Sequence, residues 1–139
     1  MTVDAEIQAY IAGQPAPKRA DMAALHARIL ALAPGCRLWF LDGRNEAGKI
    51  VSNPNIGYGA QTIPAPGGKS RDFYRIGISA NTSGISIYVI GIEDKTYLAE
   101  RFGARLGKAS ITGYCIKFKG LKDLDPAVLD ELIRFGLER

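Results

Sequence analysis

The sequence predicts an α+β fold in which a curved, mostly antiparallel sheet of about five to six strands is flanked by N-terminal and C-terminal helices. Apolar residues recur with helical spacing near both ends of the chain, whereas its middle consists of β-branched and aromatic runs. The 16 glycines break these runs into short segments, which favours strands over a helical bundle. Since 139 residues is the size of one domain, we expect residues 1–139 to form a single domain.

Two helices are predicted at the start of the chain. The first has one apolar face, made by Val3, Ile7, Tyr10 and Ile11. It ends by Gly13, because Pro15 and Pro17 prevent its continuation. The second has the apolar stripe Met22, Leu25, Ile29 and Leu32, and Pro34-Gly35 ends it.

The middle of the chain reads as a series of strands. We expect strands at 37–41, 49–52, 56–63, 73–81 and 85–92, with a loop over 64–68. The segments 73–81 and 85–92 are the strongest pair, and Asn81-Thr82-Ser83-Gly84 is predicted to join them as a hairpin.

The remainder is predicted as helix, strand and helix. A third helix is expected over 94–106, although Gly103 weakens it. A further strand is expected over 111–119. Asp125-Pro126 then opens the last helix, with aspartate as the N-cap and proline at the first helical position.

The net charge of +4 comes from 18 Lys and Arg against 14 Asp and Glu. The basic residues are scattered, so nucleic acid is not favoured as a partner. The densest basic stretch holds Lys117, Lys119 and Lys122, with Lys108 nearby. These lysines are either a solvated strand face or a site for a small anionic ligand.

The motifs of common enzymes are absent from the sequence. Gly68-Lys69-Ser70 lacks the glycine that a phosphate loop needs five positions earlier, where Ile63 stands. The one histidine, His26, is read as a boundary residue touching solvent, and no zinc motif accompanies it. Cys36 and Cys115 lie far apart and are expected to be reduced, buried thiols. The residues therefore do not favour an enzyme, and no cofactor is expected.

The N-terminus has neither a basic region nor an apolar core of the signal-peptide type. No apolar run approaches the length of about 20 residues that crosses a membrane. We therefore expect a cytoplasmic protein with no membrane partner.

Tyrosines and basic residues coincide on the expected strands. Tyrosine hydroxyls beside cations would suit a small polar or anionic ligand held against the sheet. The residues predicted to bind it are Tyr58, Arg75, Tyr88, Lys108 and Lys117. The alternative is that these tyrosines are core residues whose hydroxyls reach water.

Several segments together resemble the YdhG-like domain family. They are the helix ends Tyr10-Ile11-Ala12 and Ala33-Pro34-Gly35, the central Gly57-Tyr58-Gly59, and Thr96-Tyr97-Leu98, Gly107-Lys108-Ala109-Ser110, Cys115-Ile116-Lys117-Phe118-Lys119, Leu121-Lys122-Asp123-Leu124-Asp125 and Val128-Leu129-Asp130-Glu131-Leu132-Ile133. The resemblance spans nearly the whole chain and implies an α-β-α arrangement with a curved antiparallel sheet. The family is largely described as a domain of unknown function, and one branch is described as frataxin-like, delivering iron through surface carboxylates.

Two functions from different classes follow. The first is a non-enzymatic ligand-binding or chaperone-like protein that uses the sheet face. The alternative, implied by the resemblance, is iron binding and delivery through Asp123, Asp125, Asp130 and Glu131. From the residues alone, Asp125 reads as a helix cap, and Asp130 and Glu131 as a solvated helix face. An enzyme using tyrosine or lysine as acid or base stays open, as does a homodimer through an exposed edge or face near 73–92.

Overall fold

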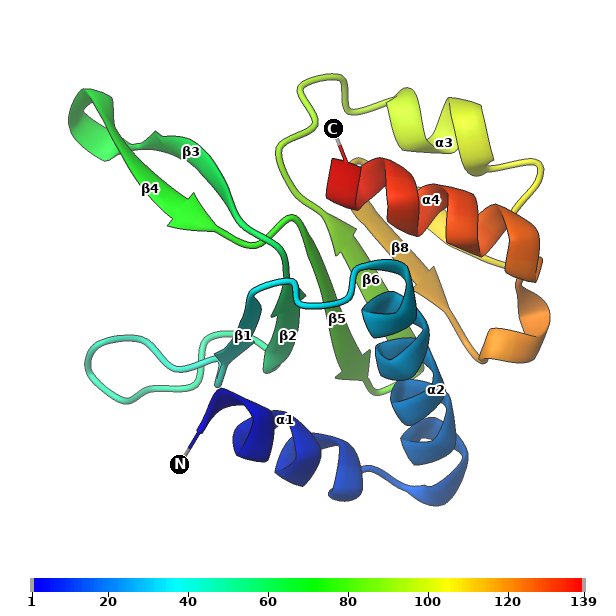
Figure 1. Ribbon diagram of the computed structural model, residues 1–139, viewed down its shortest axis with the longest axis horizontal. Coiled ribbons are helices and arrows are strands. Elements are labelled where there is room, and N and C mark those ends of the chain that lie inside the picture. The colour runs from blue at the N-terminus through cyan, green and yellow to red at the C-terminus, as the bar shows by residue number, and fades with distance from the viewer. Residues whose placement is uncertain (1, 139) are drawn as a thin grey trace.

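A six-stranded antiparallel sheet forms the centre of the protein, in the order β1-β2-β5-β6-β8-β7 (Figure 1). The computed structural model describes residues 2–138. In sheet order the strands are β1 (Leu38–Leu41), β2 (Asn55–Tyr58), β5 (Ile76–Asn81), β6 (Gly84–Val89), β8 (Cys115–Phe118) and β7 (Ser110–Thr112). Each pairs antiparallel with its neighbours, which confirms the predicted α+β class.

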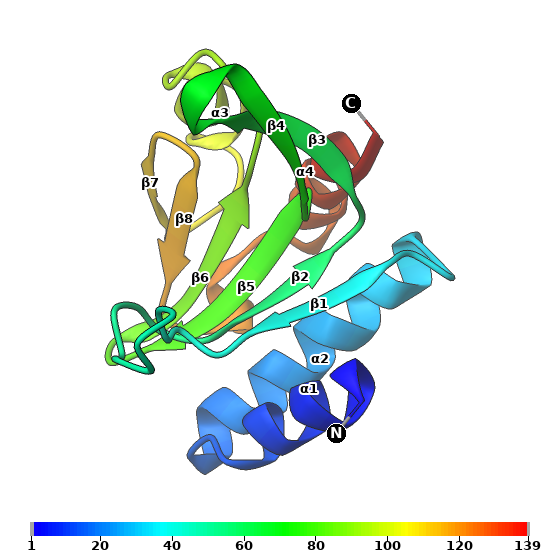
Figure 2. The same cartoon turned by 90° about the vertical axis from the view of Figure 1, so that its left-hand side faces the viewer.

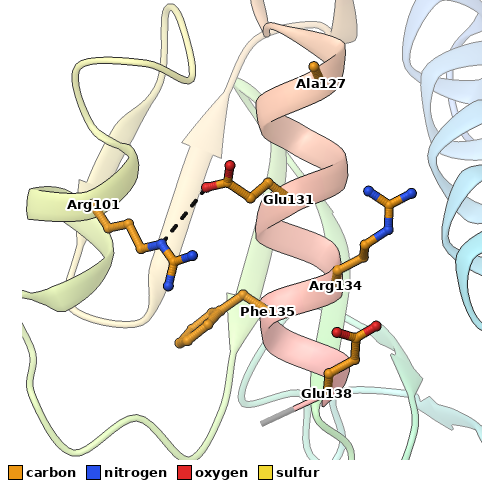
Figure 3. Close-up of a pocket in the computed structure, with 6 residues that line it drawn as sticks. All are labelled: Arg101, Ala127, Glu131, Arg134, Phe135 and Glu138. Carbon is orange, nitrogen blue, oxygen red and sulfur yellow. Dashed lines mark ion pairs between the residues drawn. The ribbon is translucent and has the colours of Figure 1, made fainter.

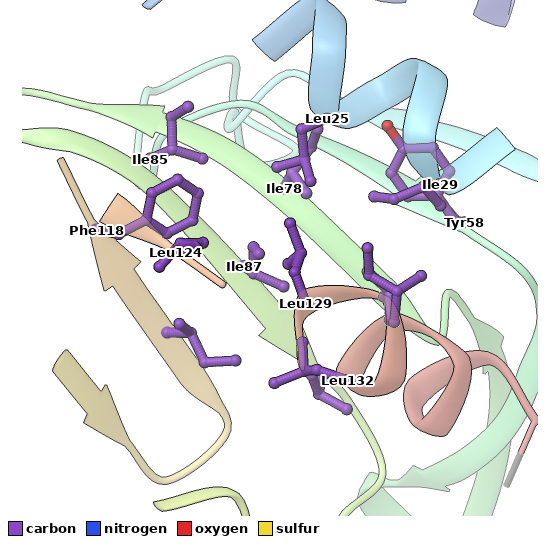
Figure 4. Close-up of a cluster of buried hydrophobic side chains, with 14 of the residues drawn as sticks. Leu25, Ile29, Tyr58, Ile78, Ile85, Ile87, Phe118, Leu124, Leu129 and Leu132 are labelled. Atoms are coloured by element: carbon purple, nitrogen blue, oxygen red, sulfur yellow. The ribbon is translucent and has the colours of Figure 1, made fainter. Parts of the chain in front are cut away.

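The helices are α1 (Val3–Ala12), α2 (Ala16–Leu32), α3 (Tyr97–Phe102) and α4 (Pro126–Glu138). In Figure 1, α2 and α4 lie on the same side of the sheet. Apolar side chains of α2, α4 and alternate strand positions interdigitate between them (Figure 4). Ile78 and Ile87 lie at the centre of this core and are fully buried. Among the described residues, no helix has the length and apolar character needed to cross a membrane.

The opposite side of the sheet, here called the open face, carries the intervening strand positions. The strand register aligns Trp39, Gly57, Gly77, Tyr88 and Cys115 in one row across it. The ring of Tyr74 lies over the glycine pair, because a Cβ atom built at Gly57 or Gly77 would fall 2.4 Å or 2.6 Å from that ring. Tyr74 is therefore only 3% exposed.

Strands β3 (Gln61–Ala65) and β4 (Lys69–Phe73) form a separate ribbon that stands away from the sheet (Figures 1 and 2). The prediction of one continuous strand over 56–63 is therefore wrong. The segment is broken between β2 and β3, where Gly59 has a φ of +79°. The predicted strand over 73–81 is also broken, at Tyr74 and Arg75 between β4 and β5, where no glycine is present. The predicted loop over 64–68 shrinks to the single turn Pro66–Gly68.

Three further expectations are corrected. Segment 49–52 is not a strand and makes only an isolated bridge between Arg44 and Ile50. Segment 111–119 is the hairpin β7–β8, because Gly113, with a φ of +58°, reverses the chain. The third helix is shorter than 94–106, and the Asp94 carboxylate accepts from the Thr96 N–H just before α3.

The predicted opening of the last helix is confirmed. Oδ1 of Asp125 accepts hydrogen bonds from the backbone N–H groups of Ala127 and Val128, at 2.9 Å and 3.2 Å. Pro126 occupies the first position of α4, where the missing N–H costs no helical hydrogen bond.

Candidate functional site

Tyr58 lies on the helix-covered side of the sheet, not on the open face. It is fully buried, and its Oη lies 2.6 Å from Nδ1 of His26 on α2, so the two side chains share a hydrogen bond. Burial raises the pKa of the Tyr58 hydroxyl. Tyr58 therefore belongs to the core and does not meet the other predicted ligand-binding residues.

His26 is buried, with 5% of its surface exposed, so its interpretation as a solvent-touching boundary residue is wrong. Its Nε2 has no hydrogen-bond partner among residues 2–138. Burial lowers the pKa of His26 from its ordinary value of 6.5, and the nearby Asp4 carboxylate only opposes this shift. Burial therefore favours the neutral form of the imidazole that lies against Tyr58.

We expect acid to destabilise the protein through His26. Below pH 6.5 the unfolded chain protonates this imidazole more readily than the folded chain. The free energy of unfolding should therefore fall as the pH falls below 6.5, until the lowered pKa of the folded state is passed. Urea titrations at several pH values measure the slope of the free energy of unfolding against pH. This slope should be shallower in His26→Gln and unchanged in Tyr58→Phe. Equal slopes in all three proteins would contradict the prediction.

The remaining predicted ligand-binding residues lie in three separate places. Tyr88 and Lys117 are on the open face, on the paired strands β6 and β8. Arg75 lies at the base of the ribbon, where its Nε donates to the carbonyl of Ala60 at 2.9 Å. Lys108 lies elsewhere, in a groove lined by several loops. The structure brings together only Tyr88 and Lys117 of the five.

Between Tyr88 and Lys117 on this face lies Cys115, which is half-buried and forms no disulfide. Burial raises the pKa of its thiol, and the nearby Lys117 and Ser86 only partly oppose this effect. The same shift, again caused first by burial, applies to Cys36. A raised pKa favours the protonated thiol over the thiolate, which is the nucleophilic form.

The groove that contains Lys108, here called the lysine groove, has a volume of about 960 Å³. Its walls come from the start of α2, from the β5–β6 turn, from the segment before β7 that holds Lys108, and from the segment between β8 and α4. Four lysines and two aspartates line it, namely Lys18, Lys108, Lys119, Lys122, Asp21 and Asp123. Its charged lining is therefore positive on balance.

Backbone contacts fix the walls of the lysine groove. The N–H of Lys108 donates to the carbonyl of Asp123 at 3.0 Å, which joins two of its walls. The Oδ2 atom of Asp21 on α2 accepts from the N–H of Leu121 at 3.2 Å, so this carboxylate already ties α2 to the segment between β8 and α4.

The groove lysines differ in their surroundings. Nζ of Lys18 donates to the carbonyl of Asn81 and ties α2 to the β5–β6 turn. Lys108, Lys119 and Lys122 are exposed, and within residues 2–138 their ammonium groups make no hydrogen bond or ion pair. Three cations without an ion pair thus line one groove, and together with Lys18 they outnumber its two aspartates, an arrangement that attracts anions.

A second hollow, of about 510 Å³, lies between α3 and α4 (Figure 3). Arg101 and Glu131 face each other across it, with Nε and Oε2 3.8 Å apart. Arg105 binds both carboxylate oxygens of Glu131, at 2.8 Å and 2.9 Å, and lowers the pKa of that carboxyl. Two arginines and two glutamates line this hollow, so its charged lining is balanced and it is a weaker candidate for an anion than the lysine groove.

The four carboxylates expected to bind iron are used separately. Asp125 caps α4, and Asp130 accepts from Nε of Arg28 at 2.5 Å. Glu131 pairs with Arg105, and Asp123 lines the lysine groove. Within the described part of the chain, no three His, Cys, Asp or Glu side chains form a group able to hold a metal ion.

The sequence reasoning missed Lys18 and Asp21 as site residues. Both lie in the first turns of α2, about a hundred residues before the lysines that they face. No local pattern marks them, because only the packing of α2 against the β5–β6 turn brings them to the groove. The close spacing of Lys117, Lys119 and Lys122 in the sequence was the one feature that indicated a basic site in this region.

No family model, no curated protein and no solved structure matches this chain.

Proposed function

We propose that this protein is a non-enzymatic binding protein for a small anionic ligand, and that the ligand occupies the lysine groove. The observation that carries this proposal is the convergence of three unpaired lysines, Lys108, Lys119 and Lys122, on a hollow of about 960 Å³. Ligand sites commonly have volumes of about 300–1,000 Å³. The proposal keeps the predicted ligand class and Lys108, and moves the site away from the sheet face.

The lining indicates what the ligand looks like. Each lysine offers a compact charge with three donors, which suits phosphate or carboxylate oxygens without fixing their plane. Pro15, Pro17 and Ala20 add an apolar wall. A ligand with two or more negative charges beside a small apolar part fits this combination better than a single carboxylate.

Two further predictions remain proposals. The unpaired cysteines Cys36 and Cys115 support a reducing, cytoplasmic location. Membership of the YdhG-like family rests on the resemblance of the sequence segments. Iron delivery gains no support from the contacts, because Arg28 and Arg105 already bind Asp130 and Glu131.

The test is a titration with pyrophosphate, citrate and nucleotides, followed by calorimetry and thermal unfolding. At a ligand concentration of a hundred times Kd, binding should stabilise the protein by about 2.7 kcal/mol. The double variant Lys108→Gln/Lys119→Gln should bind about tenfold more weakly, since it loses two charge-assisted contacts. Raising the salt concentration should weaken binding to the parent protein more than to the variant.

The matched control is Lys49→Gln/Lys95→Gln, which removes the same charge from two exposed lysines outside the groove. It should bind as the parent protein does. An equal loss in both double variants would show a non-specific charge effect. Failure of all these anions to bind would overturn the proposal, and saturable binding of ferrous iron instead would favour the carboxylates.

A further inference from the structure

The β3–β4 ribbon has two outer edges that differ chemically. Its register pairs Pro64 with Ser70 and Ile63 with Arg71. Because proline has no N–H, the Pro64–Ser70 pair must be a non-hydrogen-bonded pair of the antiparallel ladder. The N–H and C=O groups of Ser70, and by alternation those of Asp72, therefore point outward from β4.

The edge of β3 is blocked, whereas the edge of β4 is open. On β3 the outward position at Pro64 offers no donor, as is common on protected edges. On β4 both outward positions have a donor and an acceptor, and all residues from Lys69 to Asp72 are exposed. Figure 1 shows the ribbon projecting from the sheet, with no other element beside it.

Positive charge accompanies the open edge. Lys69, Arg71 and Phe73 alternate along β4 and so share one face of the ribbon. The guanidinium of Arg71 lies 4.9 Å from the centre of the Phe73 ring, and that of Arg37 lies 3.8 Å from the Trp39 ring. Phe73 meets Trp39 edge to face, with 6.0 Å between the ring centres. This face is thus basic and aromatic.

We propose that the outer edge of β4 binds an extended acidic segment of a partner protein by strand addition. Backbone hydrogen bonds to Ser70 and Asp72 would hold the segment, as in other complexes formed by adding a strand to a sheet edge. Carboxylates at alternate positions of the segment lie opposite Lys69 and Arg71, because opposite charges on neighbouring strands stabilise a ladder. This inference concerns another surface and does not depend on the lysine groove.

A second copy of this chain is a poorer occupant of the same edge. Antiparallel self-pairing about Arg71 sets the two Arg71 side chains opposite each other. If Ser70 of one copy lies opposite Ser70 of the other, Lys69 of each copy lies opposite Arg71 of the other copy. If Asp72 lies opposite Asp72, the two carboxylates face each other. Every such register places like charges directly opposite, which is destabilising. The charge pattern of β4 therefore selects an acidic partner and opposes a homodimer through this edge.

The experiment selects short random peptides displayed on phage against the full chain. Enriched peptides should carry Asp or Glu at alternate positions. A synthetic peptide of that consensus should protect the amides of Ser70 and Asp72 from hydrogen exchange. Ser70→Pro removes an outward donor without removing a ladder hydrogen bond, so it should abolish binding. Thr62→Pro makes the matching change on β3 and should leave binding unchanged.

Charge reversal gives a second, independent measurement. Lys69→Glu/Arg71→Glu should reduce the affinity for the acidic peptide at least tenfold, and should favour a peptide with lysines at the same positions. The proposal is overturned if no peptide is enriched, if protection appears elsewhere on the chain, or if Ser70→Pro and Thr62→Pro bind alike.

Discussion

Alanine at Gly77 is expected to lower the free energy of unfolding by about 2–4 kcal/mol, although it adds a single methyl group. A Cβ atom there would lie 2.6 Å from Cε1 and Cζ of Tyr74 and 2.7 Å from its hydroxyl oxygen. Real Cβ contacts are not this short, so the tyrosine ring or strand β5 must move. Gly57, paired with Gly77 under the same ring, should respond in the same way.

The Tyr74 ring is not free to move aside. It stacks on Phe73, with 4.2 Å between ring centres, and its hydroxyl donates to Oδ1 of Asn55 at 2.8 Å. Displacing it would break this hydrogen bond and expose a ring that is now buried. The two glycines thus leave room for Tyr74, whose aromatic ring occupies the space that two side chains would otherwise fill.

A double-mutant cycle separates the contact from a general effect of the substitution. Tyr74→Ala removes the ring, so Gly77→Ala should cost much less in that background than in the parent protein. Gly13→Ala is the control, because its Cβ meets nothing closer than 3.5 Å. Urea denaturation of the four cycle members and the control measures all the terms. Additive losses from Gly77→Ala and Tyr74→Ala would show that the ring is not the obstacle.

The main features of the sheet could be predicted from residue alternation. Tyr88 stands between Ile87 and Val89, and it does face away from the core, as the period of two requires. The same rule places Tyr58 on the covered side together with Ile56, so the burial of Tyr58 could have been predicted from the sequence. What alternation does not reveal is the position of a bend. The break at Gly59 depends on a positive φ and on the Trp39 side chain, whose Nε1 donates to the carbonyl of Gly59 at 2.7 Å.

The groove shows a different limit. Lys119 and Lys122 lie close together in the sequence, and this spacing alone indicates a basic cluster. Lys18 is far from them in the sequence and reaches the groove only through the fold. The four carboxylates predicted to bind iron show a related limit. Asp130 and Glu131 are adjacent in the sequence, yet on α4 they face different partners, Arg28 of α2 and Arg105 after α3. Closeness along a helix does not bring carboxylates to one ion.

Alanine at Gly84 is expected to cost about 2–3 kcal/mol and, unlike Gly77→Ala, to weaken anion binding as well. The added Cβ would lie 2.2 Å from the carbonyl oxygen of Phe118 and 2.8 Å from Cα of Lys119. Both obstacles are backbone atoms, so no side-chain rotation relieves the contact. The ends of β6 and β8 must separate where Ile85 pairs with Phe118.

This separation acts on the groove because Gly84 and Lys119 both line it. Gly120→Ala is the matched control in the same wall, since its Cβ would meet side-chain atoms alone, Oδ2 of Asp21 at 3.2 Å and Cγ of Lys122 at 4.0 Å, and no backbone atom. Urea denaturation should rank Gly84→Ala well below Gly120→Ala in stability. Calorimetry with pyrophosphate, at a temperature where both variants are folded, should show the larger loss of affinity for Gly84→Ala. If Gly84→Ala loses stability but binds pyrophosphate as the parent does, the position of Lys119 is not what the anion depends on, and the binding site must lie nearer Lys108 and Lys122.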